Sequence, residues 1–158
     1  MYKLYQLLHN GIAMVDPRWL RAAMAADGPS PQAAKPSVAS AGGGSTGIIR
    51  IHGFLDQHPS MLLDWFGGMA VDDISAMLDQ AMSTEAIGRI VLDVDSPGGS
   101  VYGIDELAGK IRQARDTKPI FAVANSLMAS AAYYLGSQAS RVMVTPGGEI
   151  GSVGVVAI

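Results

Sequence analysis

The chain has 158 residues, of which 49% are hydrophobic and 16% are charged. This composition excludes wholesale disorder and fits one ordinary domain with appendages. The formal net charge of -3 lacks the basic excess that phosphate binding needs, so nucleic acid is not an expected partner. Because the chain has no cysteine, it excludes disulfides, a thiolate nucleophile and cysteine-based metal sites.

The first 46 residues are predicted to be appendages. Polar residues interrupt the apolar run in residues 1–10, so it does not have the pattern of a signal peptide, and no window is long and apolar enough to predict a membrane span. Asp16 and Pro17 predict the start of a short helix that continues to Ala26. We expect a leader over 1–26, a flexible linker rich in Gly, Pro, Ser and Ala over 27–46, and a compact domain over 47–158.

From residue 47 onward, predicted strands and helices alternate. Runs of β-branched residues predict strands over 47–54, 89–95, 119–124 and 141–145. Apolar residues at helical spacing predict helices over 71–82, 101–115 and 129–140. A loop is expected over 55–70, and residues 96–99 are expected to break the second strand. The alternation predicts an α/β domain with a mostly parallel sheet.

The first candidate site follows the second predicted strand, in the segment DSPGGSV at residues 95–101. Ligands of α/β folds bind at the carboxyl ends of strands. Gly98 and Gly99 would let the backbone approach a ligand closely and turn N–H groups toward an oxyanion or a phosphate. A tight turn that merely needs glycine explains the same pair. The segment is neither a Walker loop nor a dinucleotide fingerprint, and no cofactor is predicted.

The second candidate is Ser130, at the junction of the third predicted strand with the following helix. Alanines on both sides leave its hydroxyl accessible, and the N–H of Ala131 is available to an oxyanion, so Ser130 is a candidate nucleophile. Negative charge is favoured at a helix N-terminus. The alternative is that Ser130 only satisfies a backbone donor at the start of the helix, although Ser126 is the better candidate for such capping.

A serine nucleophile needs a base, and the sequence offers none near Ser130. All three histidines precede Ser130, which excludes a Ser-His-Asp triad with the histidine after the serine. Lysine works as a base when burial lowers its pKa. The four lysines are expected to be solvated instead: Lys3, Lys35, Lys110 and Lys118.

Other chemically suggestive residues are interpreted as structural. Asp93 and Asp95 point to one face of a predicted strand, but they lack a third ligand, so no metal site is expected. Five further residues are interpreted as packing or as the surface of a substrate groove: Met61, Trp65, Phe66, Tyr133 and Tyr134.

Three segments carry a resemblance to a known family: IVLDVDSPGGSV at 90–101, MASAAYYL at 128–135 and GGEIGSVGV at 147–155. In this order and spacing they resemble the signal peptide peptidase A type of serine protease, and specifically its bacteriophage head-maturation members. The resemblance covers roughly residues 47–158. The segment NGIAMVDPRWL at 10–20 resembles the leader of the phage members more weakly.

The resemblance implies a ClpP/crotonase-like fold of repeated ββα units, oligomeric assembly, and peptide hydrolysis by a Ser/Lys dyad through an acyl-enzyme. Ser130 would be the nucleophile, and the N–H of Ala131 with one from Gly98 or Gly99 would form the oxyanion hole. The two glycines that usually follow the nucleophile in the family are alanines here. The lysine of the family lies further along the chain than residue 158, so the chain is expected to be the front part of a protease.

We therefore expect a serine endopeptidase that trims phage scaffold or capsid proteins in the host cytoplasm or the procapsid, without cofactor or metal. Two alternatives stay open. A crotonase-type acyl-CoA enzyme would share the fold and the paired N–H groups but use no serine nucleophile. The chain could also be an inactive fragment or an assembly partner.

Overall fold

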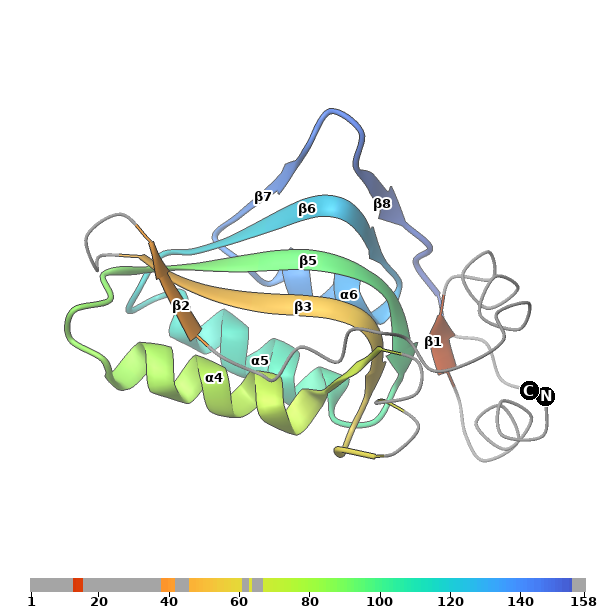
Figure 1. The fold of residues 1–158 in the computed structure, drawn as a ribbon, viewed down its shortest axis with the longest axis horizontal. Coiled ribbons are helices and arrows are strands. Elements are labelled where there is room, and N and C mark those ends of the chain that lie inside the picture. Colours follow the sequence, from red (N-terminus) through yellow and green to blue (C-terminus); the bar gives the residue numbers. More distant parts are fainter. Residues whose placement is uncertain (1–12, 16–37, 42–45, 61–62, 64–66, 155–158) are drawn as a thin grey trace.

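A computed structural model of the chain describes residues 13–15, 38–41, 46–60, 63 and 67–154. This part of the chain is built on one curved sheet with three helices (Figure 1). The strands are β1 (Ala13–Val15), β2 (Val38–Ala41), β3 (Thr46–Asp56), β4 (Met69–Ala70), β5 (Arg89–Ser100), β6 (Ile120–Ala129), β7 (Arg141–Val144) and β8 (Glu149–Gly151). The helices are α4 (Val71–Ser83), α5 (Ile104–Ala114) and α6 (Ala131–Ser137).

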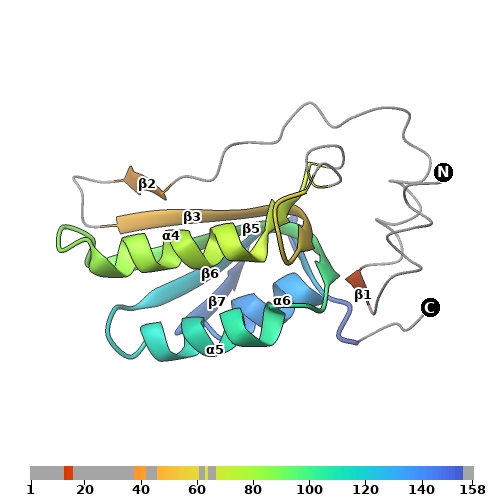
Figure 2. The ribbon, with the colours of Figure 1, turned by 90° about the horizontal axis from the view of Figure 1, so that it is seen from below.

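The centre of the sheet is parallel, as the alternating pattern predicts. Strands β3, β5, β6 and β7 follow one another as parallel neighbours, and β2 pairs antiparallel with β3 on the outside. Figure 2 shows α4, α5 and α6 on the same face of this sheet. The expectation of an α/β domain with a mostly parallel sheet is therefore confirmed.

The core lies between the sheet and these helices. The predicted inner faces of the first two helices are buried, including Ile74 and Leu78 in α4 and Leu107 and Ile111 in α5. Burial of each such side chain stabilises the fold by about 1.5–3 kcal/mol. No helix among the described residues is long and apolar enough to cross a membrane.

The three central strands bend at the same level. The pairing of β3 with β5 shifts register between His52 and Phe54, and the pairing of β5 with β6 shifts just after Val94. At the bend of β3, Gly53 has φ +71°, and a Cβ there would lie 1.9 Å from the carbonyl oxygen of Gly67. Figure 1 shows β3, β5 and β6 curving at their carboxyl ends. Beyond the bend these strands gain new neighbours, namely β4, β1 and β8.

Several boundaries differ from those that the sequence predicts. The predicted break at residues 96–99 is wrong, because β5 continues to Ser100 through pairing with β3 and β1. The expected loop at 55–70 begins with the end of β3 and closes with β4. Residues Val38–Ala41, within the segment of linker composition, form β2 by pairing with β3. The expected helix over 17–26, Met61, Trp65 and Phe66 lie outside the described residues.

Candidate active site

Ser130 sits in an unusual backbone conformation between β6 and α6. Its φ of 54° and ψ of −118° place a non-glycine residue in a sparsely populated region of conformational space. Such strain costs on the order of 1–3 kcal/mol and persists only where the surroundings over-determine it. Here the N–H of Ser130 donates to the carbonyl of Gly151 at 2.9 Å, and its carbonyl accepts from the N–H of Tyr134 at 2.9 Å. A strained serine at a strand-to-helix turn is also how α/β-hydrolases present their nucleophile.

The Ser130 side chain does not cap the helix. Ser130 occupies the N-cap position of α6, but its hydroxyl makes no capping hydrogen bond. Ser130 is only 2% exposed, so the prediction that its alanine neighbours leave the hydroxyl accessible is wrong in this structure. Within the described part of the chain, the hydroxyl donates to the carbonyl oxygen of Gly154 at 3.4 Å, a long and weak contact. Ser126, which the sequence suggests as the better cap, lies inside β6 and is exposed. The capping interpretation is therefore wrong for both serines.

The paired glycines and Ser130 both follow the end of the pairing between β5 and β6. Ser96 of β5 is in register with Met128 of β6, and Gly98 and Ser130 each come two residues later in the chain. Gly98 has φ +91°, which favours glycine. The tight-turn interpretation of these glycines is wrong, because both lie in β5 and pair with β3 on one edge and with β1 on the other.

Sequence reasoning missed the buried serine that supports these glycines. Ser96 is fully buried, and its hydroxyl donates to the carbonyl of Gly53 at 2.6 Å and accepts from the N–H of Gly98 at 3.2 Å. Ser96 thereby links Gly53, at the bend of β3, to the backbone of Gly98 in β5. The sequence feature that could have identified Ser96 is its position between an apolar run and the Pro-Gly-Gly sequence. A serine buried at such a position needs hydrogen-bond partners for its hydroxyl.

Ala131 is the first residue of α6 and is completely buried. The next residue, Ala132, is buried as well, so the helix start is packed against the sheet. Helix α6 also lies close to β6 further along its length, because a Cβ on Gly136 would lie 2.4 Å from the sulfur of Met128. Alanines in place of the glycines of the family therefore fit this interface.

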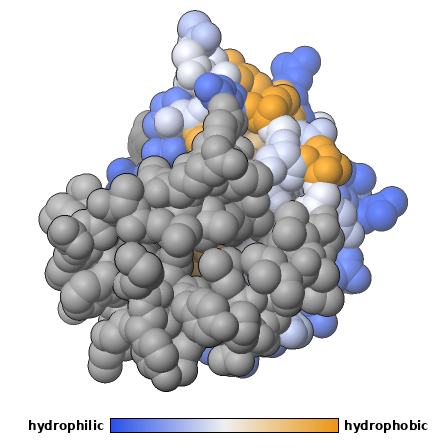
Figure 3. Space-filling view, turned by 90° about the vertical axis from the view of Figure 1, so that its right-hand side faces the viewer, coloured by the Kyte–Doolittle hydropathy of each residue, from blue (hydrophilic) through white to orange (hydrophobic). Residues whose placement is uncertain are grey.

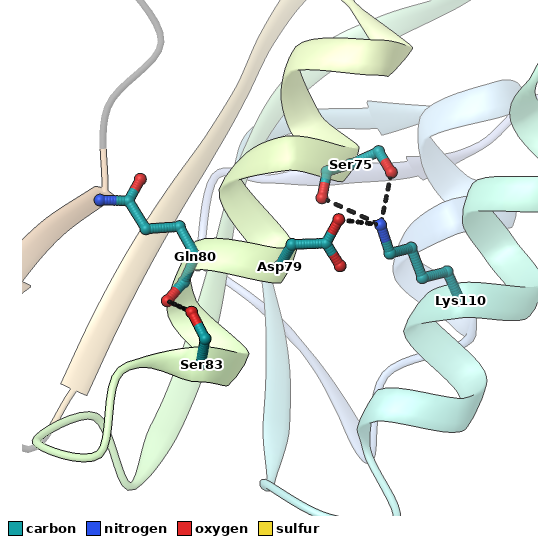
Figure 4. Close-up of polar contacts among 5 residues, drawn as sticks. All are labelled: Ser75, Asp79, Gln80, Ser83 and Lys110. Atoms are coloured by element: carbon teal, nitrogen blue, oxygen red, sulfur yellow. Dashed lines mark hydrogen bonds and ion pairs between the residues drawn. The ribbon is translucent and has the colours of Figure 1, made fainter.

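Lys110 is directed away from the site and toward α4. Its Nζ lies 2.6 Å from the carboxylate of Asp79, 2.7 Å from the hydroxyl of Ser75 and 3.3 Å from the carbonyl of Ser75 (Figure 4). In the next turn of α4, the Ser83 hydroxyl donates to the carbonyl of Gln80 at 3.1 Å. Lys110 thus joins α5 to α4, rather than being simply solvated as the sequence suggests.

Lys118 also contacts α4, at the opposite end of the sheet from Ser130. Its Nζ donates to the carbonyls of Ala81 and Thr84 at 3.0 and 2.9 Å, which satisfies acceptors at the end of the helix. Lys118 lies just before β6, whereas Ser130 lies just after it. Ten residues of strand separate the two by about 30 Å, at roughly 3.3 Å per residue.

The histidines of the described region pair with carboxylates. Nδ1 of His58 lies 2.6 Å from the carboxylate of Asp72, and Nε2 of His52 lies 3.6 Å from that of Asp93. Asp95 is exposed. No group of three or more potential metal-ligating residues occurs among the described residues.

The two adjacent tyrosines have different environments. Tyr133 packs against the core, whereas Tyr134 is partly exposed and donates its hydroxyl hydrogen to the carboxylate of Asp105 at 2.8 Å. This hydrogen bond, together with the negative charge of Asp105, raises the pKa of the Tyr134 phenol above its usual value of 10.0.

A mostly parallel sheet whose central strands bend near their carboxyl ends, with the helices on one face, is a crotonase-like α/β fold. An enoyl-CoA hydratase/isomerase family member of known structure superposes with a TM-score of 0.50 at 13% identity, covering 69% of this chain and 46% of that chain. At this identity the likeness shows the fold alone. The expected ClpP/crotonase-like fold is confirmed.

The sequence comparisons identify a peptidase family. Residues 112–158 match the model of peptidase family S49. The capsid assembly protease C of Escherichia phage lambda is 38% identical over 109 residues, covering 69% of this chain and 25% of that protein. The head-tail preconnector protein GP5 of Enterobacteria phage P21 is 42% identical over 92 residues, covering 58% of this chain and 18% of that protein. The resemblance to phage members of this protease family is confirmed, and the chain spans a quarter or less of each of these two relatives.

Proposed function

We propose that this chain carries the nucleophile and the oxyanion-binding backbone of a serine endopeptidase. The observation that carries the proposal is the strained Ser130, whose hydroxyl caps nothing and which lies at the carboxyl end of β6, beside the strand that carries Gly98. In this proposal the Ser130 hydroxyl gives its proton to the general base and attacks a peptide carbonyl. The C–N bond breaks, the protonated amine half of the substrate leaves, and water hydrolyses the resulting acyl-enzyme to release the acid half and free Ser130.

The developing oxyanion would be held by backbone N–H groups of Ala131 and of Gly98 or Gly99. The N–H of Gly98 now donates to the neutral hydroxyl of Ser96 at 3.2 Å. An oxyanion is a stronger acceptor than a hydroxyl, because hydrogen bonds to a charged acceptor are roughly twice as strong. In this proposal the N–H of Gly98 exchanges its bond to Ser96 for the stronger bond to the oxyanion. Loss of one such donor typically costs about 100- to 1,000-fold in kcat.

The general base in this proposal is a lysine from outside the described residues. Lys110 and Lys118 are both hydrogen-bonded to α4, and Lys118 lies at the opposite end of the sheet from Ser130. The family resemblance implies a lysine that follows residue 158. A Ser/Lys dyad would then be completed by that later segment, and the 158 residues alone would be inactive.

The names of the relatives suggest the substrates. A capsid assembly protease and a head-tail preconnector protein are both phage proteins, and each is at least 38% identical over its aligned region. We propose that the substrates are scaffold or capsid proteins, cleaved in the host cytoplasm or the procapsid by a homo-oligomer. An acyl-CoA enzyme has only the shared fold in its favour.

The test is cleavage of the scaffold protein by the gene product that includes the later lysine. Substitution Ser130→Ala is expected to reduce cleavage by about 1,000-fold or more, since the nucleophile of a serine protease contributes at least that much. The matched control, Ser126→Ala, is expected to keep wild-type activity. Unchanged cleavage by the Ser130→Ala variant would refute the proposal. Inactivity of the wild-type protein would instead favour an assembly role.

A further inference from the structure

Strand β1 lies on the edge of β5 that carries the paired glycines. Residues Ala13–Val15 pair antiparallel with residues 98–100, and Val15 is the partner of Gly98. At the same level the other edge of β5 is already taken by β3, since Phe54 pairs with Gly98. A strand has only two edges for pairing. Strand β1 therefore occupies the edge that faces β6 and Ser130.

This position is at the end of the pairing between β5 and β6, which Ser130 follows. The last pair is Ser96 with Met128, and two residues further along β5 Gly98 pairs with Val15 of β1 instead. Figure 1 shows β1 beside the carboxyl end of β5 and close to the segment that follows β8, and Figure 2 shows the same neighbours from below. That segment holds Gly154, whose carbonyl accepts from the Ser130 hydroxyl.

A free strand edge at such a place is a binding site for an extended peptide. Main-chain N–H and C=O groups along a strand edge bind a peptide by adding it to the sheet, largely without regard to its side chains. A peptide added to this edge would lie beside Gly98 and Gly99, at the carboxyl ends of β5 and β6 where Ser130 follows. In the present structure, strand β1 of the same chain is paired with this edge.

We propose that β1 is a built-in competitor of the peptide substrate. Its three residues hold, within the same molecule, the strand position that a substrate takes, and β1 must leave the edge of β5 before a substrate can be cleaved. The inference rests on the proposed function for what the site does, but the competition for the edge does not depend on catalysis.

Covalent connection makes β1 an effective competitor. Residues 16–37 join β1 to β2 in the sequence, and β2 is itself paired with β3, so β1 competes from within the same molecule. A covalently linked segment competes at an effective concentration that reaches the order of millimolar. A peptide of equal intrinsic affinity at micromolar concentration is therefore largely excluded while β1 is in place.

A disulfide tests the competition directly, because the natural chain has no cysteine. Ala13 and Ser100 are antiparallel partners. Such partners have Cα atoms roughly 4.5–5.5 Å apart, within the range that a disulfide spans. The double substitution Ala13→Cys with Ser100→Cys, made in a Ser130→Ala background, locks β1 on β5 when oxidised and releases it when reduced.

The probe is a fluorescent peptide with the sequence of residues 10–18, and its affinity is measured by anisotropy with and without reductant. Oxidation is expected to weaken binding by about tenfold or more. The matched control is Ala39→Cys with Ile48→Cys, which joins β2 to β3 instead. Its affinity is expected to be the same in both redox states.

A second variant releases β1 without a cross-link. Proline at two consecutive positions, Ala13→Pro with Met14→Pro, removes at least one N–H that faces β5. Peptide binding is then expected to strengthen about tenfold or more over the Ser130→Ala parent. The control, Ala39→Pro with Ser40→Pro in β2, is expected to bind as the parent does, and circular dichroism checks that both variants are folded.

Three results would overturn the proposal: no disulfide between positions 13 and 100, equal peptide affinity in the oxidised and reduced proteins, or unchanged affinity in the folded proline variant. Failure of the proposed function is separate from these. A protein that shows the predicted redox-dependent binding, but cleaves nothing when Ser130 is restored, would refute the peptidase assignment and support the competition.

Discussion

Gly99 is required by the packing of two strands, whatever its part in chemistry. A Cβ at this position would lie 1.8 Å from the carbonyl oxygen of Leu55 and 2.6 Å from the backbone carbon and nitrogen of the same residue. Contacts shorter than 3.0 Å are essentially never made by real Cβ atoms. The substitution Gly99→Ala therefore forces β3 and β5 apart by more than 1 Å, given the difference between 3.0 and 1.8 Å.

The size of this effect follows from the contacts that are lost. Overpacking of a well-packed site costs about 1–3 kcal/mol, and each strand hydrogen bond that is stretched costs about 1 kcal/mol more. We expect Gly99→Ala to lower the free energy of unfolding by about 3 kcal/mol or more. For a domain of this size the melting temperature then falls by about 12 °C or more. Urea titration followed by circular dichroism measures the change.

Gly109 provides the matched control for this prediction. It lies on the exposed face of α5, and a Cβ there would meet no atom within 4 Å. The substitution Gly109→Ala is expected to stabilise the protein by about 0.5–1 kcal/mol, because alanine loses less backbone entropy than glycine in a helix. A Gly99→Ala protein within about 1 kcal/mol of wild type would refute the packing proposed for β3 and β5.

Three further predictions concern the surroundings of the site. Asp105→Asn is expected to lower the pKa of the Tyr134 phenol, which ultraviolet titration measures. Because Asp105 raises this pKa in the folded protein, the pair contributes to stability below pH 10.0, and this contribution is lost as the pH rises through the folded-state pKa. Ser96→Ala is expected to lower stability by about 1–3 kcal/mol in urea titration, because it leaves the buried backbone groups of residues 53 and 98 without a partner. Lys110→Met and Lys118→Met are expected to retain peptidase activity in the proposed longer protein that includes the later lysine. Loss of turnover in a folded variant would contradict the proposal that neither lysine is the base.

Hydropathy and β-propensity were sufficient to predict the central fold. In the central strands, buried residues such as Ile49, Leu92 and Ala122 alternate with less buried ones, and runs of β-branched or apolar residues in the sequence predict such strands. The helices α4 and α5 follow from the spacing of their buried residues. These features are local, so a single sequence contains them.

The bends and the outer strands depend on contacts between distant residues. Residues Val38–Ala41 have the composition of a linker, and only their pairing with β3 makes them a strand. The low strand propensity of Gly98 and Gly99 predicts a break at residues 96–99, but β1 and β3 pair with these glycines on both edges and keep them in β5. Tertiary pairing of this kind overrides local propensity.

Exposed apolar residues mark another surface of the molecule. They lie on β7 and β8 and just beyond: Val142, Met143, Val144, Ile150 and Val153. Figure 3 shows hydrophobic residues exposed toward the top of the face that it presents. Nothing in the structure shows what covers these side chains, whereas the edge beside Ser130 has a defined occupant.

The candidate site was predictable in its chemistry but not in its geometry. Ser130, Gly98, Gly99 and Ala131 were identified by residue type and by family resemblance. The positive φ of Ser130 and the hydrogen bonds of Ser96 require a folded backbone to be seen. The catalytic assignment of these residues stays a prediction.

Everything proposed for this site depends on the Ser130 hydroxyl acting as the nucleophile. The most direct measurement is peptide-mapping mass spectrometry of the proposed longer protein, which includes the later lysine, after reaction with a protein substrate and rapid acid quenching, which traps the acyl-enzyme. An acyl adduct on the tryptic peptide that contains Ser130, absent from Ser130→Ala and present in Ser126→Ala, is the predicted result. An adduct on a different residue, or equal acylation and cleavage by the Ser130→Ala protein, would contradict it.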